Sequence, residues 1–105
     1  MKVSEIKASD VSNYLRLPEQ LDESETSFIN SCLNIAKNFI ENYTGIPQTS
    51  EIEKAETLDS YEDLSIVVLI LCQDMYDTRS MYVEKNTVNK TVQTILDMHT
   101  RNNLI

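Results

Sequence analysis

The chain has 105 residues, which allows one domain with one modest hydrophobic core and is too short for two. Apolar residues make up 41% and charged residues 25%, values that exclude a wholly disordered protein, and one glycine and two prolines are too few for the many turns of a β-rich fold. The net charge of −8 argues against a basic DNA-reading surface and against docking on anionic lipid. Composition therefore favours a helical protein whose partners are neither nucleic acid nor membrane.

The excess of acidic over basic residues is confined to the first part of the chain. Residues 1–63 carry thirteen acids and five bases, whereas residues 64–105 carry four of each. We find no apolar stretch typical of a signal peptide, and the longest apolar run, Ile66–Cys72, is too short to span a bilayer. We expect a protein made and kept in the cytosol, in which Cys32 and Cys72 are buried thiols rather than a metal or redox pair.

The first predicted element is a short helix over residues 10–15. Ser9 has the chemistry of an N-cap residue, and Leu17-Pro18 ends the helix because proline disfavours helical geometry in the residue before it. We expect this helix to cover a core that is built by other elements.

The second helix has the clearest pattern in the sequence. Asp22 or Ser24 is its expected N-cap, and Gly45 followed by Pro47 predicts its end. Steps of three and four place two apolar rows on what we expect to be a single buried face. The rows are Phe28, Cys32, Ile35, Phe39, Tyr43 and Ile29, Leu33, Ala36, Ile40.

A polar, acidic segment over residues 48–57 predicts an exposed loop, and a third helix follows it. We expect that helix to start near Asp59-Ser60 and to run to about Arg79 or Tyr82. Its centre, Ile66–Cys72, is apolar on all sides, and a helix with no polar face is hard to cover within so small a domain. A central position in the core and a surface for self-association are equally compatible with this pattern.

A short last helix is expected from about Val88, ended by Asn102-Asn103. The sequence thus predicts an all-α fold: a small bundle of about four helices, with one short N-terminal helix, two long core helices and one short C-terminal helix. We expect a single domain over residues 1–105 with an exposed loop near residues 48–58.

The sequence offers no recognisable catalytic set, and we expect a protein that is not an enzyme and holds neither cofactor nor metal. One glycine is incompatible with a phosphate-binding loop or a dinucleotide fingerprint, and His99 is the only histidine. We expect His99 to interact with the C-terminal dipole of its helix. Asp74 and Asp77 share a helix face and are expected to be a solvated or interface-facing pair, and the acids near residues 51–63 lack the spacing of a calcium loop.

Two short stretches resemble a known family. The helix end Tyr43-Thr44-Gly45, within IENYTGIP, and the block Tyr76-Asp77-Thr78-Arg79, within LCQDMYDTRSM, lie at the places where head-tail connector (head-completion) proteins of tailed bacteriophages carry similar residues. The order of a short leading helix, an acid-capped helix, a hydrophobic helix and a short terminal helix resembles that family along nearly the whole chain. The segment Val83–Thr87 departs from it, because members often have a proline or small residues there.

The resemblance implies a structural adaptor from a phage or prophage. Such proteins form a ring, typically of twelve copies, at the head-tail junction of the virion, beneath the portal protein and above a stopper or tail-completion protein. DNA passes through the channel without sequence-specific binding, and an acidic wall would let it slide. The implied subunit-interface or core residues are Leu64, Val67, Val68, Leu69, Leu71, Met75, Tyr76 and Arg79. The implied portal-contacting residues of the last helix are Val92, Ile95, Leu96, His99 and Arg101.

Two other classes of function compete with the connector hypothesis. A small acidic helical regulator, such as an antitoxin or anti-repressor, would use its negative charge and an exposed apolar helix to block a partner's basic site. A small enzyme with unrecognised chemistry is the weaker alternative, because no polar residues converge in the sequence. Neighbouring portal and capsid genes would favour the connector, and a neighbouring toxin gene would favour the regulator.

Overall fold

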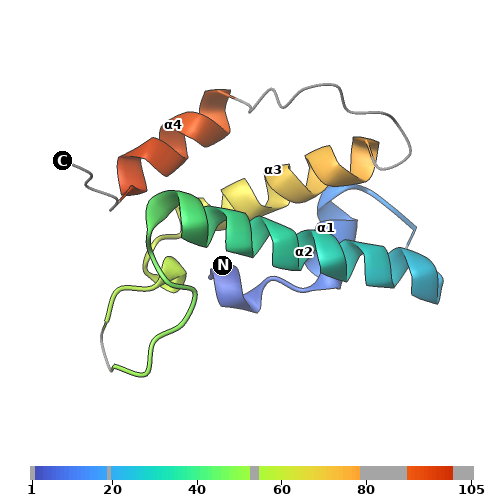
Figure 1. Ribbon diagram of the computed structural model, residues 1–105. Coiled ribbons are helices and arrows are strands. Elements are labelled where there is room, and N and C mark those ends of the chain that lie inside the picture. Colours follow the sequence, from blue (N-terminus) through green and yellow to red (C-terminus); the bar gives the residue numbers. More distant parts are fainter. Residues whose placement is uncertain (1, 19, 53–54, 79–89, 101–105) are drawn as a thin grey trace.

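The computed structural model describes residues 2–18, 20–52, 55–78 and 90–100 (Figure 1). This part of the chain contains helices and no strand, which confirms the predicted all-α fold with about four helices. The α-helices are α1 (Ala8–Tyr14), α2 (Glu23–Thr44), α3 (Asp63–Thr78) and α4 (Lys90–His99), and two 3-10 turns cover Val3–Glu5 and Leu58–Ser60. The expected positions Tyr82, Val88 and Asn102-Asn103, and the segment Val83–Thr87, lie outside the described residues.

Helix α1 begins one residue before the predicted cap. Lys7 is the extended residue that precedes the helix, and the Asp10 carboxylate accepts a hydrogen bond of 2.8 Å from the Lys7 backbone N–H. Ser9 is therefore a helical residue, and its prediction as N-cap was wrong because Asp10 already satisfies the backbone at the first turn. The chain leaves α1 through Arg16, which has a φ of 60°, and the Leu17 N–H donates to the Ser12 carbonyl.

Both ends of α2 follow from local chemistry. The Asp22 side chain accepts a hydrogen bond of 2.8 Å from the Glu25 N–H, which caps one of the unpaired donors of the first turn. At the other end Gly45 has a φ of 80° and its N–H donates to the Glu41 carbonyl. The predicted cap Asp22 and the predicted terminator Gly45 are both confirmed.

Helix α3 starts at Asp63, later than the predicted Asp59-Ser60. Residues 58–60 instead form a 3-10 turn that buries Leu58 completely. The Asp59 carboxylate accepts hydrogen bonds from the Ser4 backbone N–H at 2.8 Å and from the Ser4 hydroxyl at 2.6 Å. The chain is extended again at Tyr61, and α3 begins two residues later.

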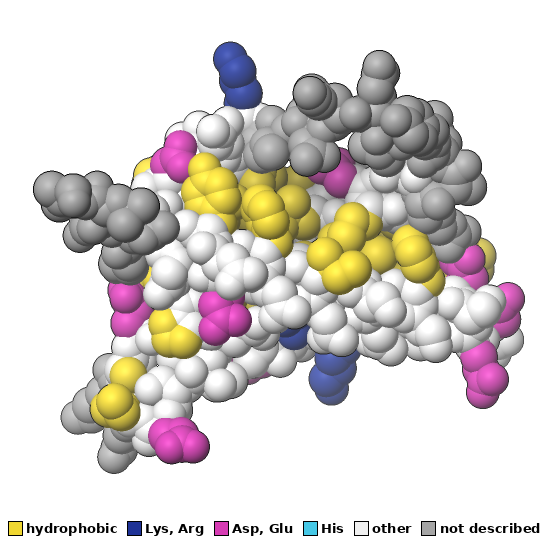
Figure 2. Space-filling view, in the orientation of Figure 1, with side chains coloured by type: hydrophobic (Ala, Val, Ile, Leu, Met, Phe, Trp, Pro, Cys, Tyr) yellow, Lys and Arg dark blue, Asp and Glu magenta, His cyan; other side chains and the backbone are white. Residues whose placement is uncertain are grey.

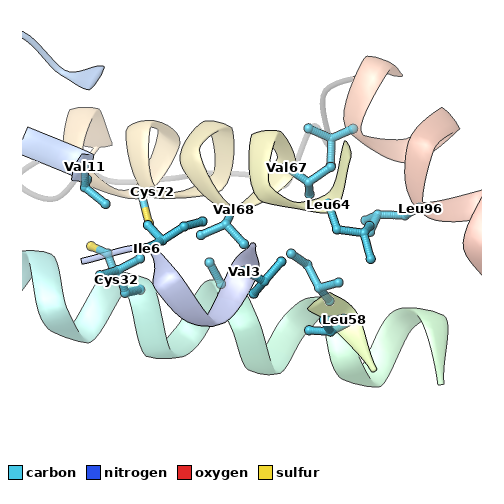
Figure 3. Packing of buried hydrophobic residues seen from close by; sticks show 14 of the residues in the cluster. Val3, Ile6, Val11, Cys32, Leu58, Leu64, Val67, Val68, Cys72 and Leu96 are labelled. Carbon is cyan, nitrogen blue, oxygen red and sulfur yellow. The ribbon is translucent and has the colours of Figure 1, made fainter. Parts of the chain in front are cut away.

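The core lies mainly between α2 and α3, which run side by side in Figure 1. The Val3–Glu5 turn and α1 cover one side of this pair, and α4 lies against α3 and the C-terminal end of α2. Figure 3 shows Ile6, Cys32 and Val68 of this core pointing toward one another. The fully buried hydrophobic side chains are Ala36, Ile40, Ile46, Leu58, Leu64, Val67, Val68, Cys72, Val92 and Leu96.

Candidate interaction surface

One side of α3 forms part of the core. Leu64, Val67 and Val68 are fully buried. The Tyr76 hydroxyl donates a hydrogen bond of 2.7 Å to Glu25, and its ring centroid lies 6.2 Å from that of Phe28. The other residues of this predicted set that the structure describes are only partly buried; they are Leu69, Leu71, Met75 and Tyr76. Arg79 lies outside the described residues.

The opposite side of α3 keeps apolar surface in contact with solvent. Ile66 is 51% exposed, and the helical repeat places it opposite Leu64 and Val68. Ile70, four residues further along the same side, is half-buried. The sequence pattern left open whether α3 is a core helix or an association surface; one side of the helix lies in the core, and self-association stays a hypothesis.

Helix α2 has a narrower buried face than we predicted. The row Ile29, Leu33, Ala36 and Ile40 is buried, but the neighbouring row leaves the core at two positions, since Ile35 is 56% exposed and Phe39 is 38% exposed. The buried face is centred on the first row, so the second lies at its edge. In Figure 2 hydrophobic side chains form a broken line along the edge of α2 that faces α3 and α4.

Helix α4 presents a different side from the one implied by the family resemblance. Val92 and Leu96 are fully buried and Ile95 is half-buried, whereas Met98 is 68% exposed. Val92 and Leu96 therefore pack in the core of this chain. Arg101 lies outside the described residues.

His99 joins the end of α4 to the start of α3. Its Nε2 atom lies 2.8 Å from an Asp63 carboxylate oxygen, and its ring centroid lies 4.4 Å from that of Tyr61. His99 lies in the last turn of its helix, where we expected it to interact with the helix dipole. Its side-chain partner is the Asp63 carboxylate, 36 residues away in the sequence. A second side-chain contact links α2 and α4, because the Tyr43 hydroxyl donates a hydrogen bond of 2.7 Å to Asp97.

Among the described residues, the surroundings move the pKa values of Cys72, Asp74 and Tyr43. Burial raises the pKa of the Cys72 thiol to about 12, and the nearby Cys32 thiol adds to the effect. Burial and the neighbouring Asp77 raise the pKa of Asp74. The hydrogen bond to Asp97 raises the pKa of the Tyr43 phenol. Both cysteines are free and buried, as predicted, but the fold also brings them near each other, which their distance in sequence did not indicate.

No three His, Cys, Asp or Glu side chains of the described residues are placed to hold a metal ion. A hollow of about 410 Å³ lies between α1 and the start of α2. Its lining has no ionisable side chain and consists of Ala8, Ser9, Ser12, Asn13, Leu21 and Thr26. In the same part of the chain, no helix combines the length and the hydrophobicity needed to cross a membrane.

Comparison with known proteins gives no identification. The sequence matches no family model, and neither a curated protein nor a solved structure matches it. The features available for functional inference are therefore the exposed apolar side chains of α2, α3 and α4. Sequence analysis did not single out Ile66, Ile35 or Met98 as exposed, because helical periodicity gives the relative direction of side chains but not which neighbouring helix covers them.

Proposed function

We propose that this chain is a structural head-tail connector subunit of a phage or prophage virion, which joins copies of itself into a ring beneath the portal. The observation that carries the proposal is the exposed apolar side of α3 at Ile66. An isoleucine exposed within the most hydrophobic helix of a chain is a candidate for burial against a neighbouring subunit. The subunit would have no catalytic role and would be made in the bacterial cytoplasm.

The two stretches that resemble the family lie at contacts between helices. Tyr43 and Gly45 are at the end of α2, where Tyr43 bonds to Asp97 of α4. Tyr76 is near the end of α3 and bonds to Glu25 in the first turn of α2. Residues at such corners set the angles between helices, which supports their reading as structural elements of an adaptor.

The proposed roles of the predicted residues are refined by their burial. Leu64, Val67 and Val68 would maintain the subunit core, whereas Ile66 and Ile70 would contact the next subunit. Contact between α4 and the portal would use exposed Met98 rather than buried Val92 and Leu96. The net charge of −8 would then suit a channel through which DNA moves without capture.

The test uses a phage portal protein as the partner, and the proposal predicts that the gene for such a protein lies beside this one. The native chain should bind the assembled portal and add a ring that electron microscopy can resolve. Ile66→Glu should lose ring formation while its circular dichroism spectrum stays native. Ile52→Glu is the matched control, because Ile52 is 73% exposed in the loop that precedes α3 and is assigned no contact.

Two results would count against the proposal. One is a native chain that never binds the portal at any concentration. The other is an Ile66→Glu variant that assembles rings as well as the Ile52→Glu control. Binding to a basic regulatory protein in place of the portal would instead favour the antitoxin or anti-repressor hypothesis.

A further inference from the structure

The outer surface of α2 carries asparagines at a strict spacing of four residues. They are Asn30, Asn34, Asn38 and Asn42, and all four are exposed. Asparagine is a poor residue for a helix interior, and each one costs about 0.6 kcal/mol relative to alanine. A helix surface that needed only solubility would be filled by glutamate, lysine or glutamine. The repeated use of an unfavourable residue along one ridge indicates a role for its amide groups.

The surface around this asparagine ridge is free of charge to an unusual degree. From Thr26 to Ile40 the only charged residue is Lys37, although one residue in four of the whole chain is charged. Exposed Ser27 and Ser31 lie beside the ridge, and exposed Ile35 and Phe39 form its apolar edge. Depletion of charge combined with an aromatic and aliphatic edge is the composition found at the centre of protein interfaces.

Several amide and hydroxyl groups on this surface have no partner within the described chain. The structure gives no side-chain hydrogen bond within that part of the molecule to Ser27, Asn30, Ser31 or Asn34. Asn38 differs, because its side-chain oxygen accepts a hydrogen bond of 2.6 Å from Gln48. Most of the ridge is therefore available to donate to and accept from another molecule.

Electrostatics select a second copy of this chain as that molecule. A basic partner would be recognised by acids, and the ridge has none. Two copies that each carry a charge of −8 repel one another across most of their surfaces. An uncharged strip of amides, which donate and accept equally, is where two such copies can meet without opposing carboxylates.

The charged residues beside the ridge fix the relative direction of the two helices. In a parallel pair, Lys37 and Glu41 of one copy would each lie beside the same residue of the other. In an antiparallel pair centred on residue 36, Asn34 lies opposite Asn38, and Glu41 lies opposite Ser31. The antiparallel arrangement therefore removes the like-charge contacts and also sets the two helix dipoles in opposition.

We propose that two copies of the chain pair through antiparallel α2 helices, whose asparagine ridges pack against each other with Asn34 of one copy beside Asn38 of the other. Ridges of residues spaced by four pack into one another at a crossing angle of about −50°. The pair is isologous, with one two-fold axis near residue 36. This contact uses neither Ile66 nor Met98 and goes beyond the proposed function, since the pair would form from free subunits.

The first experiment introduces charges of either sign on the asparagine ridge. The double variants Asn34→Glu/Asn38→Glu and Asn34→Lys/Asn38→Lys are each measured alone and in equal mixture by sedimentation velocity, beside the native chain. Glutamate and lysine favour helix more than asparagine does, so both variants should keep the fold. We expect the native chain to form a concentration-dependent dimer, each variant to be at least tenfold weaker, and the mixture to dimerise again. Thr94→Glu, at an exposed position of α4, is the control for added charge.

The second experiment tests the register by disulfide formation. Asn34→Cys and Asn38→Cys are oxidised separately and together, and the native Cys32 and Cys72 give little background because they are buried. The mixed disulfide should exceed either self-disulfide, and Thr94→Cys should give only the yield of random collision. The proposal is overturned by a native chain that stays monomeric throughout, by double variants that dimerise as the native chain does, or by equal disulfide yields at all three positions. Ring formation on the portal tests the proposed function separately.

Discussion

Helices α2 and α3 are the two longest helices of the described chain, yet they are bounded in different ways. Asp22 and Gly45 end α2 by hydrogen bonds to residues within four positions of themselves. The turn that precedes α3 is held instead by a contact between Asp59 and Ser4, which are 55 residues apart. The ends of a helix can be predicted from the sequence when nearby residues set them. They cannot when a residue distant in the sequence holds the turn beside the helix.

The two helices also distribute apolar residues differently. The buried row of α2 has a polar surface opposite it, and the exposed large apolar residues of the helix are Ile35 and Phe39 at the edge. Helix α3 is apolar around its centre and exposes Ile66 on the side away from the core. Fully apolar sequence therefore does not mean full burial, and the proposed function would give the exposed side of α3 a role.

A charge in the buried side of α3 should have the largest effect. Val68→Asp places an unpaired carboxylate in the core and should lower the free energy of unfolding by about 4 kcal/mol or more, which would unfold the domain. Circular dichroism with urea titration measures this. Ile66→Asp on the exposed side of the same helix should stay folded, and equal loss in both variants would contradict the two-sided description of α3.

Truncation of one isoleucine in each apolar row of α2 should have different effects on the free energy of unfolding. Ile40→Ala should lower the free energy of unfolding by about 3 kcal/mol, because Ile40 is fully buried and leaves a cavity. Ile35→Ala should cost less than about 1 kcal/mol, since that side chain is already more than half exposed. Similar losses in a chemical denaturation experiment would show that the edge of α2 is part of the core.

The local end of α2 can be tested at its glycine. Gly45 is left-handed with a φ of 80°, so Gly45→Ala should cost about 1 to 2 kcal/mol through strain at the β-carbon. Gly45→Asn should cost less, because asparagine tolerates this conformation better. Thermal denaturation of the pair gives the comparison, and an alanine variant as stable as the native chain would remove strain as the reason for glycine here.

The facing thiols of α2 and α3 should have no effect on stability at neutral pH and should matter only at high pH. The pKa of Cys72 is raised to about 12, so an unfolded thiol loses its proton near pH 9 while the folded one keeps it. Ionisation of Cys72 should leave stability unchanged below pH 9 and lower it as the pH rises from 9 toward 12. Cys72→Ala should show a shallower fall over that range.

Thiol labelling gives an independent measure of the same burial. At pH 8 a thiol-specific reagent should modify the native chain only as fast as it unfolds, and addition of denaturant should expose both cysteines. Rapid labelling of the folded protein would contradict the buried position of the two groups.

The sequence predicted the all-α fold, the limits of α2 and the burial of both cysteines, because each depends on periodicity or on neighbours in the chain. It misplaced the cap of α1, where the reciprocal bond of Asp10 competes with Ser9. It gave no sign of the His99–Asp63 contact or of the closeness of Cys32 to Cys72, since these arise only from how the helices pack. Exposure of Ile66 and Ile35 likewise depends on which neighbours the fold supplies.

The loop between α2 and the second 3-10 turn is closed at its base by a hydrogen bond of 3.0 Å from the Leu58 N–H to the Pro47 carbonyl. Ile46 and Leu58 anchor its two ends in the core. Doubling the length of a loop with fixed ends costs only about 0.6 kcal/mol. A short peptide tag inserted near Ser50 should therefore leave the helices undisturbed, which would allow the protein to be tracked by fluorescence in living cells.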